Sequence, residues 1–249
     1  MIMQESRSPS VLARIGSLLS MRLLVPLVVV DLAFVVGSVV QEARFGIDLQ
    51  DPSPWLLEAD GGYSETWGYL LQAALAASLV TLAVLSRRPV WLGWAALFAA
   101  ALADDKLRLH ENKGAWLADR LGERLWFPPD GFLGLRANDL GEILVWGLLS
   151  VVPLTVVALC LRNSDHRTRR ANLGVAVLVA AYVFFGGVVD QLHVLVLDTP
   201  LAGSTGTVED GGELVVLSLT LAHVATLLRR AVRARRARST GAEPAPAPI

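Results

Sequence analysis

Two histidines and several carboxylic acids interrupt apolar stretches of the chain. These are the side chains whose chemistry could support a function. In chain order this group comprises Asp104, Asp105, His110, Glu111, Asp139, Glu142, Asp190, His193, Glu209, Asp210 and Glu213. Imidazoles and carboxylates without thiols are a ligand set for Zn, Fe or Mn. Asp190 and His193 are three residues apart, so both would project from one face of a helix. The pattern therefore predicts a divalent metal ion as the cofactor.

The predicted roles of these residues fall into two groups. As metal ligands we expect His110, Glu111, Glu142, Asp190, His193, Glu209 and Glu213. As residues that support the ligands or contact a substrate we expect Asp104, Asp105, Arg108 and His223. A bound metal would polarise an ester or amide and activate water, as in a hydrolase, or carry oxidation chemistry, as in an oxidoreductase. For Gln72, in contrast, we expect only an ordinary interhelical hydrogen bond.

An ion-paired polar core is an alternative to the metal, with Lys106 and Arg108 balancing nearby acids. The charges argue against it. Even when the three acids best suited to a helix N-terminus are set aside, six acids face these two bases. Such an excess of buried carboxylate requires a cation, a proton or water. Two alternatives to the metal site remain: a relay in which these acids carry protons, and a structural network of polar side chains.

The signatures of familiar membrane enzymes are missing from the sequence. It has no H-x-x-x-H, G-x-S-x-G or H-E-x-x-H motif, and the single cysteine, Cys160, excludes an intrachain disulfide or a cysteine-rich metal site. We therefore predict a metal-dependent membrane enzyme of unfamiliar type, acting on a lipidic or membrane-accessible substrate. A cation or proton transporter using the same acids is the alternative, and a structural subunit of a membrane complex is a third. A continuous polar route across the membrane would favour the transporter.

The elements that must position these residues are apolar segments long enough to cross a bilayer. Crossing about 30 Å of hydrocarbon takes about 20 residues. Six segments qualify, at 21–40, 67–85, 90–109, 140–161, 173–197 and 212–228. Only 18% of the residues are charged, whereas a soluble domain carries about a quarter. The sequence thus predicts an all-α, polytopic transmembrane helical bundle of about six spans. Its expected partner is the lipid bilayer, and no nucleic-acid partner is expected.

The charges between these segments predict the orientation in the membrane. Arginines gather before the first segment, between the second and third, between the fourth and fifth, and after the sixth, whereas the stretch after the first segment is acidic. Basic loops lie on the cytoplasmic side of membrane proteins. We therefore expect a multi-pass protein of the plasma (inner) membrane, with both termini in the cytoplasm and the predicted site near the extracytoplasmic side.

Three regions are expected along the chain. Residues 1–20 form a cytoplasmic N-terminal arm, with a candidate surface helix at 11–20. Residues 21–230 form the six-helix domain, whose outer loop 110–138 has the amphipathic pattern of an interfacial helix. Residues 231–249 form a tail that is first basic and then rich in Ala and Pro, a composition typical of disorder.

Overall fold

The computed structural model describes residues 20–46, 52–121, 135–196, 199 and 202–239. Its helices, in chain order, are α2 (Met21–Phe45), α3 (Tyr63–Ser86), α4 (Val90–Leu107), α5 (Leu109–Leu121), α6 (Ala137–Arg162), α7 (His166–Val183), the π-helical η1 (Phe184–Val189), α8 (Asp190–Val196) and α9 (Ala202–Ser239). The predicted all-α bundle is confirmed.

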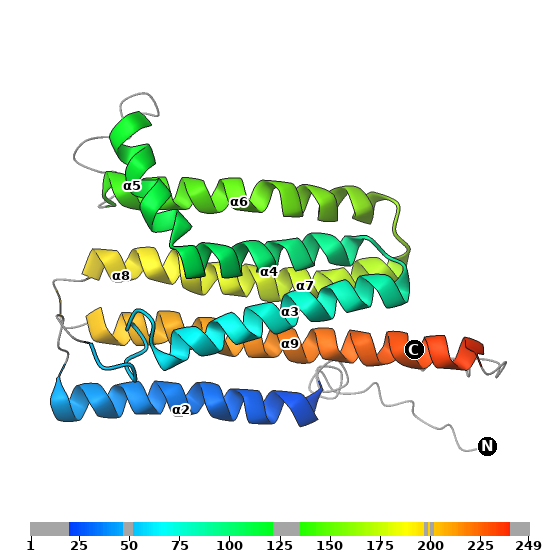
Figure 1. The fold of residues 1–249 in the computed structure, drawn as a ribbon, viewed down its shortest axis with the longest axis horizontal. Coiled ribbons are helices and arrows are strands. Elements are labelled where there is room, and N and C mark those ends of the chain that lie inside the picture. Colours follow the sequence, from blue (N-terminus) through cyan, green and yellow to red (C-terminus); the bar gives the residue numbers. More distant parts are fainter. Residues whose placement is uncertain (1–19, 47–51, 122–134, 197–198, 200–201, 240–249) are drawn as a thin grey trace, which may run out of the picture.

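Five of the helical runs are long and apolar enough to cross a membrane. They are α2, α3, α6, the continuous run from α7 to α8, and α9. The sixth, α4, runs alongside them (Figure 1) and ends in the charged residues Asp104, Asp105 and Lys106. The helices therefore pass between the two ends of the bundle about six times, as predicted.

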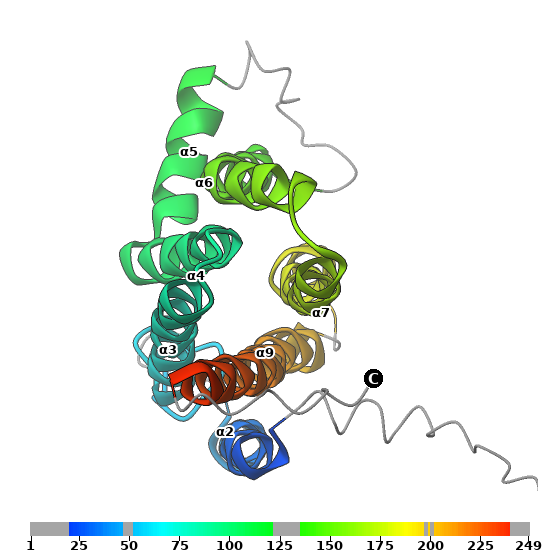
Figure 2. The same cartoon turned by 90° about the vertical axis from the view of Figure 1, so that its right-hand side faces the viewer.

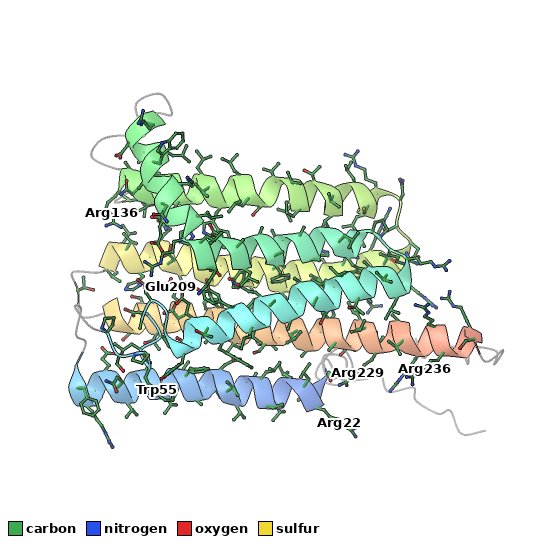
Figure 3. The ribbon with its side chains drawn as sticks, viewed as in Figure 1. Arg22, Trp55, Arg136, Glu209, Arg229 and Arg236 are labelled. Atoms are coloured by element: carbon green, nitrogen blue, oxygen red, sulfur yellow. The ribbon has the colours of Figure 1, made fainter. Side chains whose placement is uncertain are left out.

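The two ends of the bundle differ in charge. Arg22, Arg229 and Arg236 lie at one end in Figure 3, which we call the basic end. Glu209 lies at the opposite end, which we call the acidic end, together with the starts of α3, α6 and α9 and the close of α2, α4 and α8. Helix α5 lies across α6 at the acidic end, as the end-on view in Figure 2 also shows.

The apolar core lies between α3, α4, α7 and α9. On α3, Leu71, Leu75 and Leu79 follow the helical repeat of about 3.6 residues and are at most 2% exposed. They belong to one buried cluster with Trp94 and Phe98 of α4. This cluster fills most of the interior between the four helices.

Large apolar side chains also cover the outside of the bundle. Val29 and Val36 on α2 are 59% and 60% exposed, and Leu148 and Val152 on α6 are 59% and 69% exposed. Leaving such surface in water is unfavourable by about 25 cal/mol per Å². Contact with lipid chains removes this penalty, so the exposed faces of α2 and α6 suit a membrane.

Several helix boundaries differ from those expected from hydropathy. Helix α9 begins ten residues before the predicted segment and continues through the arginine run to Ser239. Arginines in its last turn complement the helix dipole, which hydropathy does not register. The outer loop contains helix α5. Residues 1–19, with the candidate surface helix, and 240–249 lie outside the described residues.

Candidate functional site

A break between α4 and α5 brings His110 back onto the end of α4. Arg108 adopts the left-handed conformation, with φ 49° and ψ 48°, which ends α4. The His110 backbone N–H donates to Asp104 Oδ1 at 2.8 Å, and His110 Nδ1 lies 2.9 Å from Asp104 Oδ2. The expectation of one unbroken segment over 90–109 is therefore wrong. Left-handed backbone costs roughly 1–2 kcal/mol in a residue with a side chain, and the two bonds to Asp104 offset it.

His110, Asp104 and Asp105 form a group with the spacing of metal ligands. One ligand atom from each residue lies within 4.8 Å of the others, and Asp104 is fully buried. A carboxylate only accepts hydrogen bonds, so Asp104 places the His110 proton on Nδ1 and leaves the lone pair on Nε2. Metal-binding histidines are commonly oriented by a carboxylate in this way. The geometry assigns Asp104 to orientation and leaves His110 Nε2 and Asp105 as ligand candidates.

The surroundings of His110 favour positive charge. Burial lowers the pKa of His110, but the hydrogen bond with Asp104 and the charges of Asp104, Glu142 and Glu111 outweigh burial and raise it. Glu142 comes from α6, which also places the Trp146 ring 6.0 Å from the His110 ring. A proton and a metal cation would therefore compete for this position.

Gln72 holds Asp105 from the neighbouring helix α3. It is 1% exposed, and its Nε2 donates to Asp105 Oδ2 at 2.6 Å and to the Tyr182 hydroxyl at 2.9 Å. The amide orientation follows from the carboxylate, which accepts from an N–H and repels a carbonyl oxygen. Gln72 Oε1 accepts no hydrogen bond from the described part of the chain. The interhelical hydrogen bond predicted for Gln72 is confirmed, but the sequence did not connect Gln72 with the site.

A cavity of about 210 Å³ opens beside this group at the acidic end. Its charged lining residues are Glu58, Asp60, Glu65, Asp105, Arg108, His110, Glu111, Asp210 and Glu213, and Gln72 also lines it. Asp60 forms an ion pair with Arg108 at 2.5 Å, and Glu65 accepts from the Tyr69 hydroxyl. Arg108 therefore does not neutralise Asp104, Asp105 or Glu111 by direct pairing, as the ion-paired core required. The excess of acid persists in the folded protein.

The second histidine, His193, lies at the same end on α8. Its Nδ1 is 3.1 Å from Glu209 Oε2 on α9. Glu58, from the loop between α2 and α3, faces His193, and burial raises the Glu58 pKa although the His193 charge opposes this rise. Glu58 was not among the predicted ligands, because it lies in an acidic loop that sequence reasoning used only for orientation.

The η1 segment brings Glu213 of α9 toward the other acids. A Cβ on Gly186 would meet the Glu213 carboxyl group, and a Cβ on Gly212 would meet the Phe185 ring. Only glycine leaves room for these contacts, and a π-helical turn is a frequent feature of functional sites. Glu213 thus reaches the cavity that Asp105 and His110 also line.

The structure gathers most of the predicted residues and separates one. His110, Glu111 and Glu213 line the cavity, Glu142 neighbours His110, and Asp190 and Glu209 neighbour His193. His223 is ten residues beyond Glu213, or about 15 Å along α9. It lies against Gly174 of α7, where a Cβ would be 2.7 Å from its Nε2. His223 therefore belongs to the core toward the basic end and not to the cavity.

A family model described as "Domain of unknown function (DUF8692)" matches residues 21–229 of the chain. The match spans the bundle from the start of α2 into the arginine run of α9. Comparison with the curated proteins finds no match, and comparison with the solved structures finds none either.

Proposed function

Because the chain belongs to the family described as a domain of unknown function (DUF8692), we propose its function from the site alone. The protein is a metal-dependent membrane enzyme that acts on a lipidic or membrane-accessible substrate. The observation that carries this proposal is His110, held through Nδ1 by the buried Asp104 and lying within ligand distance of Asp105 at the wall of a cavity.

The chemistry of the donors fits a divalent cation such as Zn, Fe or Mn. His110 Nε2 and an Asp105 oxygen would hold it, with Glu111 and Glu213 as further carboxylates in the same cavity. A bound cation supplies Lewis acidity and an activated water for hydrolysis, or carries oxidation chemistry. Asp104 orients the imidazole, and Gln72 orients the Asp105 carboxylate.

The proposed setting is the plasma (inner) membrane, with the basic end in the cytoplasm. Arg22, Arg229 and Arg236 gather at one end of the bundle, and such clusters mark the cytoplasmic side of membrane proteins. The cavity then faces the extracytoplasmic side, close to the ends of the lipid-exposed helices. A substrate carried in the outer leaflet would reach it from the bilayer.

Transport of a cation or proton is the second candidate, because buried polar groups lie below the cavity. Asp31 of α2 is fully buried, accepts from Trp67 Nε1 at 2.8 Å and neighbours Ser218 of α9. Below it the core of α3 is apolar at Leu75 and Leu79, which favours the enzyme. Metal uptake by vesicles containing the protein, abolished by Asp31→Asn, would decide for transport instead.

Metal content measured by elemental analysis tests the proposal. We expect protein purified from metal-replete cells to hold stoichiometric metal, and His110→Ala and Asp105→Asn to lose the metal bound at His110. The matched controls are His166→Ala at the start of α7 and Asp119→Asn on α5, both exposed. Absence of metal from the unmodified protein would refute the proposal, and full retention in both site variants would refute this choice of ligands.

A further inference from the structure

Another cavity, of about 550 Å³, opens at the basic end of the bundle. It lies between two connections, from α3 to α4 and from α6 to α7, which meet at this end in Figure 1. Its polar lining comes from Ser86, Arg87, Arg88, Asn163 and Ser164. The lining thus holds two arginines and, among the described residues, no carboxylate. A cavity of this composition favours an anionic ligand.

Two of the arginines at this end support the fold. Arg88 donates from Nη2 to Asp165 Oδ2 and so ties the two connections together. Asp165 also caps the start of α7, so the carboxylate nearest the cavity is already occupied. Arg169 donates to the last carbonyls of α6, at 3.3 Å to Leu161 and 2.9 Å to Arg162. Neither guanidinium is left over to bind a ligand.

Arg87 has no such structural partner. Its exposed side chain lines the cavity and forms no ion pair or hydrogen bond within the described part of the chain. Its backbone, with φ 56° and ψ 37°, ends α3 in the left-handed conformation. Glycine is the usual residue there, because a side chain makes this conformation unfavourable. An arginine kept at such a position indicates a use for the guanidinium itself.

An apolar stripe on the outside of α6 leads to the same cavity. Leu148, Val152, Val156 and Leu159 follow one another at intervals of four, four and three residues, so they share one face of the helix. All four are exposed, and Leu159 also lines the cavity. A lipid whose chains lie along this stripe would therefore have its headgroup at the cavity.

We propose that this cavity binds the phosphate of an anionic phospholipid from the leaflet at the basic end, with Arg87 as its main ligand. A guanidinium offers paired N–H donors that match the oxygens of a phosphate. The Asn163 amide in the same lining is a further donor. Basic pockets between spans on the cytoplasmic side are typical sites for anionic headgroups. The inference does not depend on the metal proposed at the acidic end.

The reactivity of Cys160 tests the inference in the full-length protein. Cys160 lines the cavity and is the single cysteine of the chain, so its rate of maleimide labelling reports on occupancy. The protein is compared in nanodiscs of phosphatidylcholine and in nanodiscs of equal parts phosphatidylcholine and phosphatidylglycerol. We expect phosphatidylglycerol to slow the labelling about tenfold, because a hydrogen bond to a charged group changes affinity by roughly that factor or more.

Two variants separate a specific site from the general charge of this end. Arg87→Gly removes the guanidinium and suits the left-handed backbone, so its thermal stability in detergent should be kept or raised. Phosphatidylglycerol should no longer slow labelling in this variant. Arg170→Ala removes the same charge from an exposed position on α7 outside the lining, and it should keep the slowing.

Several results would overturn the inference. One is labelling in the unmodified protein that is equally fast in both kinds of nanodisc. Another is slowing that persists in Arg87→Gly, or that is lost equally in Arg170→Ala, since either would mean that the guanidinium of Arg87 is not the ligand. Equal slowing by inorganic phosphate in phosphatidylcholine nanodiscs would identify a soluble anion in place of the lipid.

Discussion

Asp104 has the most constrained role of any single residue at the acidic end. Its side chain is fully buried, and both of its oxygens bind His110, one through the backbone N–H and one through the ring. Orientation of an imidazole by a carboxylate raises its basicity and holds its lone pair on the metal. Asp104 is therefore a positioning residue for His110, which is the proposed metal ligand.

Asp104→Asn tests this role. An amide replaces one acceptor oxygen with a donor NH₂, so one of the two His110 nitrogens that face Oδ1 and Oδ2 of Asp104 would face a donor. We expect Mn²⁺ affinity at the His110 centre to fall about 10- to 100-fold, the range for loss of such an orienting partner. Unaltered Mn²⁺ affinity at His110, relative to the exposed control Asp119→Asn, would contradict the role.

Among the helices, the site depends on how closely α5 crosses α6. Gly114 and Gly141 meet at the crossing, where a Cβ on Gly141 would lie 2.8 Å from the Gly114 carbonyl carbon. A Cβ on Gly114 would lie 2.7 Å from the Glu142 backbone nitrogen. Since α5 begins just before His110, this crossing sets the distance between His110 and Glu142.

Gly141→Ala should therefore disturb the site, because it would push against Gly114, which lies one helical turn after His110 on α5. The contact is with backbone, which cannot move aside as a flexible side chain would, so we expect a loss of about 1–3 kcal/mol in stability. Thermal unfolding in detergent and Mn²⁺ binding at the His110 centre should both decline.

The matched control for this change lies on the same helix. A methyl group added at Gly147 would have no neighbouring heavy atom within 4 Å. Gly147→Ala should therefore be neutral or stabilising by up to about 1 kcal/mol, because alanine favours helix. Equal effects of the two substitutions would show that the crossing does not position α5.

For the whole molecule, the proposed orientation in the membrane rests on the separation of charge between its two ends. Cys160 is the single cysteine, so a Cys160→Ser chain is a clean background for labelling. Asp119 on α5 and Arg167 on α7 are both exposed and belong to the acidic and basic ends. We expect Asp119→Cys to react with a membrane-impermeant maleimide in intact cells, and Arg167→Cys to react only after permeabilisation. The reverse pattern would place the cavity in the cytoplasm.

The membrane bundle and the rough depth of its polar groups follow from the sequence alone. Hydropathy is a local property of each segment, and a helix rises a constant 1.5 Å per residue, so the segments at 21–40 and 67–85 already predict two spans. The same arithmetic places Asp190 and Glu213 toward one end. These conclusions need no knowledge of which helices touch.

Which of these groups meet is a property of the tertiary structure. The pairing of His110 with Asp104 needs the left-handed residue Arg108, and Glu58 comes to His193 from a loop whose position hydropathy does not encode. Partners depend on the rotation and crossing of whole helices, which long-range packing sets. A shift of one residue turns a side chain by about 100° around its helix, so depth alone could not tell that His223 points into the core while Glu213 reaches the cavity.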